Sequence, residues 1–191
     1  MIEKAYLKAH GGYDFDGSNS SRDLFVLTGW LPEIIDLVEC DRERTWQRIL
    51  TGYRNRDCLI TVGTGAIADE EAVGLASNHA YAVLEIMELN NVRMLMLKNP
   101  WGRFEYKGKF SANDKRNWTP ELKKAFGYDQ TAGKENGVFW MDFDSLCDNY
   151  ESLYMNWNPA LLAYRKSFFD LWKSADMAHE AFISVKSNPQ Y

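Results

Sequence analysis

The chain lacks a long hydrophobic run and an excess of positive charge. No apolar stretch approaches the ~18 residues of a membrane-spanning helix, and residues 1–6 have neither the basic nor the apolar region of a secretion signal. We therefore expect a cytoplasmic protein without a transmembrane segment. The formal net charge is -5 and lysine and arginine form no run. This charge balance predicts neither nucleic acid nor an acidic membrane as a partner.

Cysteine is also scarce. The three cysteines, Cys40, Cys58 and Cys147, are odd in number, widely spaced and in no metal-ligand pattern. Such usage fits reduced intracellular thiols better than a disulfide framework. Cys40 and Cys147 stand in helix or turn contexts and Cys58 in an apolar strand. We interpret all three as small core residues and not as nucleophiles.

The residues that are present describe a globular protein. Hydrophobic residues make up 46% and aromatic residues 14% of the 191 positions, which suits one domain, or one lobe of a larger domain followed by a tail. Periodicity and capping residues predict helices at 2–9, 41–53, from the cap Thr119 to 126 and from the cap Asp144 to 150, with a short helix or turn at 22–28. Strands are predicted at 34–38, 58–62, 79–87, 92–98, 137–141 and 152–157, with a short hairpin at 104–110.

Two polar residues on neighbouring strands suggest chemistry. His79 begins one apolar strand and Asn99 closes the next. A thiol nucleophile needs such a pair, because an imidazole accepts the thiol proton and an amide oxygen fixes the imidazole tautomer. The alternative is structural: a hydrogen-bonded histidine and an ordinary Asn-Pro turn.

The register of this hairpin decides whether the pair can meet. A two-residue turn at 90–91 would place Asn99 on the opposite side of the sheet from His79, because side chains alternate along a strand. An odd-numbered loop centred near Leu89 would bring both onto one side. We predict the second register, or a bulge with the same effect. That register also pairs Glu85 with Arg93.

The segment between the strand at 58–62 and His79 consists largely of small and acidic residues and contains several glycines. We expect residues 63–78 to form an exposed loop. A long loop beside a candidate base is often a substrate gate, and a plain surface loop is the alternative.

These segments carry a resemblance to a known family. In order along the chain, the motifs NHAYAV (78–83), LKNPWG (97–102) and GVFWM (137–141) resemble the histidine motif, the asparagine motif and a downstream strand of the calpain-type cysteine peptidase domain. EKAY (3–6) and LTG (27–29) resemble the end of that domain's cysteine-bearing lobe. YDF (13–15) and NWTPEL (117–122) are most similar to the atypical, PalB-like calpains.

The resemblance implies an α+β, papain-like fold, of which this chain is mainly the antiparallel-sheet second lobe with a few helices. Residues 1–29 would be the truncated end of the cysteine-bearing lobe and 30–158 the His/Asn lobe. Residues 159–191 are interpreted as a linker into a missing downstream domain. The active cleft would lie between the two lobes.

The same resemblance implies roles for three residues. His79 would be the general base and acid, and Asn99 would orient it. Trp101 matches the tryptophan that covers their hydrogen bond or wedges the cleft when the lobes are misaligned. The implied activity is that of an endopeptidase acting on intracellular proteins and peptides.

The sequence departs from the family pattern at the nucleophile. The Gln-Gly-x-x-Gly-Asp-Cys-Trp context, with its oxyanion-stabilising glutamine, is absent from the 191 residues. We therefore expect the chain to be inactive alone and to need the missing cysteine-bearing lobe as a partner. A non-catalytic scaffold or interaction module is the alternative. A transglutaminase-like enzyme is disfavoured, because it would need an aspartate where Asn99 stands.

Calcium is a further ligand that the resemblance raises. Conventional calpains bind one ion in each lobe through carboxylates and carbonyls, and Glu105 matches one ligand of the second lobe. The next acidic position reads Ala112, with Asp114 two residues on, and Asn136 stands where another acid would help. A solvated glutamate is the simpler interpretation of Glu105.

Overall fold

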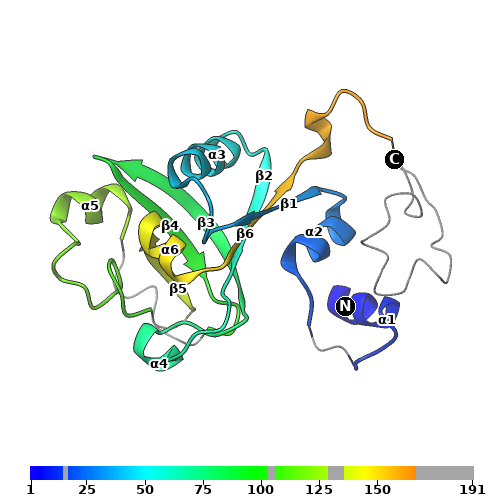
Figure 1. Ribbon diagram of the computed structural model, residues 1–191, viewed down its shortest axis with the longest axis horizontal. Coiled ribbons are helices and arrows are strands. Elements are labelled where there is room, and N and C mark those ends of the chain that lie inside the picture. The colour runs from blue at the N-terminus through cyan, green and yellow to red at the C-terminus, as the bar shows by residue number, and fades with distance from the viewer. Residues whose placement is uncertain (15–16, 103–105, 129–135, 167–191) are drawn as a thin grey trace. The chain divides into compact units, whose positions relative to one another are not determined.

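The main structural feature of the protein is a six-stranded antiparallel sheet (Figure 1). The computed structural model describes residues 1–14, 17–102, 106–128 and 136–166. The chain divides into a unit of Met1–Leu161, which contains the sheet, and a second unit of Leu162–Tyr191. In sheet order the strands are β1 (Leu31–Asp36), β6 (Ser152–Trp157), β2 (Cys58–Gly63), β3 (Ala80–Leu89), β4 (Val92–Lys98) and β5 (Val138–Asp142). The α+β fold predicted from the sequence is confirmed.

The described residues also form helices. They are α1 (Ile2–Ala9), α2 (Ser20–Thr28), α3 (Arg42–Arg54), α4 (Glu70–Val73), α5 (Pro120–Ala125) and α6 (Phe143–Asn149), with a 3-10 turn at Pro159–Leu161. Thr119 caps α5 as predicted, since its side chain accepts a hydrogen bond from the Leu122 N–H. The predicted cap Asp144 of α6 is wrong. Asp142, in the extended conformation that a cap requires, accepts from the Ser145 N–H instead.

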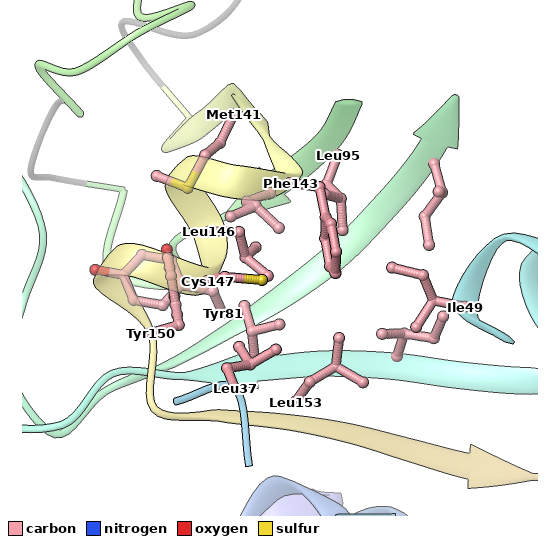
Figure 2. Close-up of a cluster of buried hydrophobic side chains, with 14 of the residues drawn as sticks. Leu37, Ile49, Tyr81, Leu95, Met141, Phe143, Leu146, Cys147, Tyr150 and Leu153 are labelled. Carbon is pink, nitrogen blue, oxygen red and sulfur yellow. The ribbon is translucent and has the colours of Figure 1, made fainter. Parts of the chain in front are cut away.

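The main core lies between one face of the sheet and helices α3 and α6, which contact each other. Side chains alternate along each strand, so this face carries every second residue of β2 and β6. Figure 2 shows Tyr81 and Leu95 from the strands together with Phe143 and Leu146 from α6. All four are at most 1% exposed. Burial on this scale favours the folded state by about 25 cal/mol for each Å² of apolar surface removed from water.

Helix α2 packs on the opposite face of the sheet. The hydroxyl of Ser20 lies 2.6 Å from that of Thr61 in β2. The side chain of Asn156 in β6 donates to the backbone oxygens of Ser21 and Trp30, at 2.8 and 3.2 Å. These bonds fix the start and the exit of α2 to the sheet.

The register of β3 and β4 combines the two predicted possibilities. The turn is the tight one at residues 90–91, with Leu89 opposite Val92 and positive φ at both asparagines. The register then shifts at Leu84, which is an extra residue between the Val83 and Glu85 pairs. A bulge of this kind adds one residue to one strand only. The predicted loop centred near Leu89 is therefore wrong, and the predicted alternative, a bulge with the same effect, is confirmed.

The bulge also changes the predicted charge pair of the hairpin. Glu85 faces Met96, and Arg93 faces Glu88. Arg93 forms its ion pair with Glu43 of α3 instead. The predicted pairing of Glu85 with Arg93 is wrong because it assumes the register of the odd-numbered loop.

Two other loop predictions need correction. Residues 106–110 contain no strand, so the predicted hairpin at 104–110 is wrong over its described part, and Phe104 and Glu105 lie outside the described residues. The loop at 63–78 is less exposed than predicted. It contains α4, and Leu75 and Ala76 are at most 1% exposed.

Candidate functional site

The bulge in β3 places His79 and Asn99 on one face of the sheet. Ala82 faces Lys98 and Val83 faces Leu97, so continuing the same register sets Tyr81 opposite Asn99. His79 is two residues before Tyr81 and therefore points to the same side. The residues that the sequence predicts as a pair are thus brought together at the end of the β3–β4 hairpin.

The side chains of the pair form a direct hydrogen bond. Nε2 of His79 lies 2.9 Å from Oδ1 of Asn99, and Asn99 is fully buried while His79 is half-buried. The backbone N–H of Trp101 donates to the same Oδ1 at 3.0 Å. Because that backbone nitrogen can only donate, the atom facing both groups is the amide oxygen.

The bond fixes the tautomer of the imidazole. An amide oxygen only accepts, so Nε2 of His79 must carry the hydrogen, and in the neutral ring Nδ1 is then the basic nitrogen. Among the residues that the structure describes, Nδ1 has no hydrogen-bond partner. Nδ1 of His79 is therefore the atom of this site that can accept a proton.

Trp101 covers the pair. Its ring centroid lies 3.9 Å from that of His79, with 35° between the planes, and its side chain is about half exposed. Tyr81 contacts the imidazole edge-on from within the core, at 5.0 Å between centroids. The histidine ring is therefore held between a buried and a partly exposed aromatic ring, which limits the access of water to its bond with Asn99.

The Asn99–Gly102 turn is supported by Gly137, directly before β5. The N–H of Asn99 donates to the Gly137 oxygen at 2.9 Å. Gly137 has φ +73, and a Cβ at this position would lie 2.6 Å from the backbone oxygen of Asn99. Only glycine fits both the left-handed backbone and this close approach.

Thr64, directly after β2, supports His79 through the backbone. The N–H of Thr64 donates to the His79 oxygen at 3.0 Å, and the N–H of His79 donates to the Thr64 hydroxyl at 3.0 Å. The sequence pattern assigns no role to Thr64, and it includes Gly137 only as the first residue of the strand motif GVFWM. A glycine directly before a strand is a signal that could point to Gly137, whereas the partner of Thr64 depends on a register that the sequence leaves open.

Cys58 and Cys147 do not offer an activated thiol, and Cys40 is partly exposed. Burial raises the pKa of Cys58 to about 12, with the charge of Asp57 adding to the effect. Burial likewise raises the pKa of Cys147 to about 12, with Cys40 adding to it. A nucleophilic cysteine has the opposite property, a lowered pKa. These two residues lie in the core, as predicted.

The region predicted to bear calcium ligands lacks a ligand set among its described residues. Glu105 is outside those residues, and Ala112 offers no side-chain oxygen. The carboxylate of Asp114 accepts four hydrogen bonds, from the backbone N–H groups of Phe110, Arg116 and Asn117 and from the Asn117 side chain. Oxygens occupied by these donors are not directed at a cation.

Asn136 does not change this result. Its side-chain oxygen accepts a hydrogen bond from the Val138 N–H at the start of β5, at 3.0 Å. Within the described ranges no group of three or more histidine, cysteine, aspartate or glutamate side chains could hold a metal ion. The described residues of this region do not make up a calcium site.

Within those same ranges, no helix has the length and apolar character needed to cross a membrane.

Comparison with known proteins shows the family of this chain. The family model described as calpain family cysteine protease matches residues 1–156. Calpain-7 of Mus musculus is 43% identical over 199 residues, and Calpain-7 of Homo sapiens is 42% identical. Each alignment covers 100% of this chain and 24% of the relative. A calpain-like protease palB/cpr-8 of Neurospora crassa is 39% identical, again over 100% of this chain and 20% of the relative.

The chain thus spans a quarter or less of the length of these curated relatives. The likeness to both Calpain-7 and PalB agrees with the resemblance to the atypical calpains that the motifs suggest. Since the family model covers most of the chain, and covers the histidine, the asparagine and the strand beyond them, the chain belongs to the calpain family of cysteine proteases.

Proposed function

We propose that this chain supplies the base-bearing half of a calpain-like cysteine endopeptidase site. His79 is the general base and acid, Asn99 orients it, and Trp101 shields their bond. The nucleophilic thiol comes from the part of the cysteine-bearing lobe that is outside the 191 residues. Residues 30–158 form the His/Asn lobe, residues 1–29 the end of the other lobe, and residues 159–191 a linker.

The observation that carries this proposal is the bond from Nε2 of His79 to Oδ1 of Asn99. This bond leaves Nδ1 as the nitrogen that accepts a proton, and it keeps the imidazole in one orientation. A structural histidine needs no such free nitrogen facing away from its partner. The covering ring of Trp101 adds support, because a shielded bond holds the tautomer more strongly than one open to water.

The chemistry follows from the tautomer. Nδ1 takes the proton of the incoming thiol, which gives a thiolate and an imidazolium whose second N–H remains bonded to Asn99. The thiolate attacks a peptide carbonyl carbon, and Nδ1–H returns the proton to the leaving amine. Nδ1 then accepts a proton from water, which attacks the thioester and releases the acid and the free thiol. Substrates of this reaction are proteins and peptides.

The test joins a cysteine-bearing lobe ahead of Met1 and measures hydrolysis of an unfolded protein substrate. His79→Ala should lower kcat by on the order of a thousandfold or more, because loss of the base removes the whole thiol–imidazole unit. His10→Ala is the matched control: His10 is exposed and follows α1 as its C-cap residue, so its replacement should leave kcat unchanged. The chain of 191 residues alone should not turn over substrate.

Two results would contradict the proposal. One is a joined polypeptide that folds, carries a free active-site thiol and hydrolyses nothing, which would favour the scaffold alternative. The other is turnover that survives His79→Ala. Labelling of the 191-residue chain by a thiol-directed peptide probe, at Cys40, Cys58 or Cys147 and linked to turnover, would also contradict it.

A further inference from the structure

The loop before His79 is closed by a compact set of hydrogen bonds. The N–H of Asn78 donates to the Gly65 oxygen at 2.9 Å. One step nearer the sheet, Thr64 and His79 face each other and extend the β2–β3 ladder by one pair. The loop between them therefore returns to the sheet at the residue that carries the imidazole.

Ala76 anchors this loop from inside. Its oxygen accepts the Thr64 hydroxyl at 2.7 Å, and its N–H donates to the hydroxyl of Tyr81 at 2.8 Å. Ala76 is 1% exposed, as is Tyr81, and Thr64 is 6% exposed. Both backbone groups of a buried residue are thus satisfied by side chains, one from Tyr81 in β3 and one from Thr64 directly after β2.

The hydroxyl of Thr64 connects the loop to the candidate base. It donates to Ala76, whose oxygen is closer than that of His79 (2.7 against 3.2 Å), and it accepts from the His79 N–H at 3.0 Å. A hydroxyl has the single donor and the acceptor lone pairs that this bridge requires. Valine has the same shape and neither capacity, whereas serine has both.

We propose that Thr64 is a positioning residue for His79. Its hydroxyl joins the end of the loop at Ala76 to the backbone of His79, and so sets the position from which the imidazole reaches Asn99. The significance of this link for catalysis rests on the proposed function, but the link itself can be measured without turnover.

The test follows the imidazole of His79 by nuclear magnetic resonance in the 191-residue chain labelled with 15N. The Nε2–H resonance, identified by its absence in His79→Gln, reports the bond to Asn99, and amide exchange reports the His79 N–H. Thr64→Val should speed exchange of both hydrogens by about tenfold or more, because each loses the protection of a hydrogen bond or of a fixed geometry. Thr64→Ser should keep both within about threefold of the original rates.

Thr61→Val is the matched control. Thr61 is in β2, the strand that Thr64 directly follows, and its hydroxyl bonds to Ser20 on the opposite face of the sheet. Loss of the Thr61 hydroxyl should leave the exchange rates of both His79 hydrogens unchanged. If Thr64→Val fails to fold, Tyr81→Phe serves as the second variant. It frees the Ala76 N–H and should speed exchange of the Nε2–H at least about threefold.

A folded Thr64→Val chain with both exchange rates within about twofold of the original would overturn the proposal, as would equal effects of Thr61→Val. In the joined polypeptide, Thr64→Val should lower kcat by roughly ten- to a hundredfold with KM nearly unchanged, since a misplaced base costs rate more than binding. Absence of turnover in the joined polypeptide before any substitution would contradict only the proposed function.

Discussion

Oδ1 of Asn99 accepts two hydrogen bonds at nearly equal length, from Nε2 of His79 at 2.9 Å and from the backbone nitrogen of Trp101 at 3.0 Å. The second bond closes the turn that follows β4. The same oxygen therefore shapes the backbone that carries Trp101 and orients the ring that Trp101 covers. A substitution at Asn99 should affect both the turn and the imidazole.

Asn99→Ala should lower the free energy of unfolding by about 1–3 kcal/mol, because two donors lose their acceptor at a fully buried position. It should also abolish the slowly exchanging Nε2–H resonance of His79. Urea unfolding and nuclear magnetic resonance measure the two effects. Asn156→Ala is the control: Asn156 is equally buried and bonds to Ser21 and Trp30 on the other face. It should lower stability and leave the His79 resonance intact.

If Asn99→Ala kept the Nε2–H resonance, the imidazole would have another acceptor and the orienting role of Asn99 would be wrong. Equal loss of the resonance in both variants would mean that it reports general stability and not the pair.

The positions of the predicted elements could be derived from local pattern, whereas the contacts of the site could not. The cap Thr119 and the strands around His79 and Asn99 follow from side-chain type and periodicity. The bulge at Leu84 does not, because nothing in the apolar sequence of β3 distinguishes the extra residue from its neighbours. The sequence requires some irregularity if His79 and Asn99 are to meet, but its place is decided by packing on both faces of the sheet.

Long-range backbone contacts also cannot be predicted from the sequence. Thr64 and His79 are 15 residues apart and Gly137 and Asn99 are 38 apart, so their contacts depend on strand order. The prediction of the α6 cap is wrong for a local reason. Both Asp142 and Asp144 are good capping residues, and the choice between them depends on where β5 ends.

Gly137→Ala should disturb the site through the backbone alone. The added Cβ meets the Asn99 oxygen at 2.6 Å, at a residue with φ +73. Gly127→Ala is the matched control, because Gly127 has φ +56 and a Cβ added there would have nothing within 4 Å. We expect about 1–2 kcal/mol of destabilisation at Gly127 from the left-handed backbone, and roughly 1–3 kcal/mol more at Gly137 from the close contact.

Thermal or urea unfolding compares the two variants, and the Nε2–H resonance should weaken only in Gly137→Ala. Equal stability of the two variants would show that the turn moves freely away from Gly137, which would argue against a rigid support for Asn99.

Alkylation should distinguish the three thiols of the folded chain. At pH 8 a thiol whose pKa is about 12, as for Cys58 and Cys147, has only about one thiolate in ten thousand molecules. Cys40 is partly exposed. Iodoacetamide should therefore label Cys40 first, with Cys58 and Cys147 labelled only after unfolding in urea. Peptide mass spectrometry measures the order, and rapid labelling of Cys58 or Cys147 in the folded chain would contradict the core assignment.

Acid should loosen the loop at residues 110–117 through Asp114. Burial raises the pKa of this carboxyl group. Hydrogen bonds from Phe110 and Asn117 lower it by a larger amount, so its pKa lies below the ordinary value. A group with a lowered folded-state pKa stabilises the fold above its unfolded pKa, near 4, and loses that contribution as the pH falls through the folded value. The free energy of unfolding should therefore fall more steeply below about pH 4 in the original chain than in Asp114→Asn.

Asp144→Asn, which removes an exposed carboxylate paired with Arg42, is the control and should keep the original slope. Urea unfolding between pH 6 and pH 2 measures all three chains, and identical slopes for the original chain and Asp114→Asn would mean that the four bonds to this carboxylate do not form in solution.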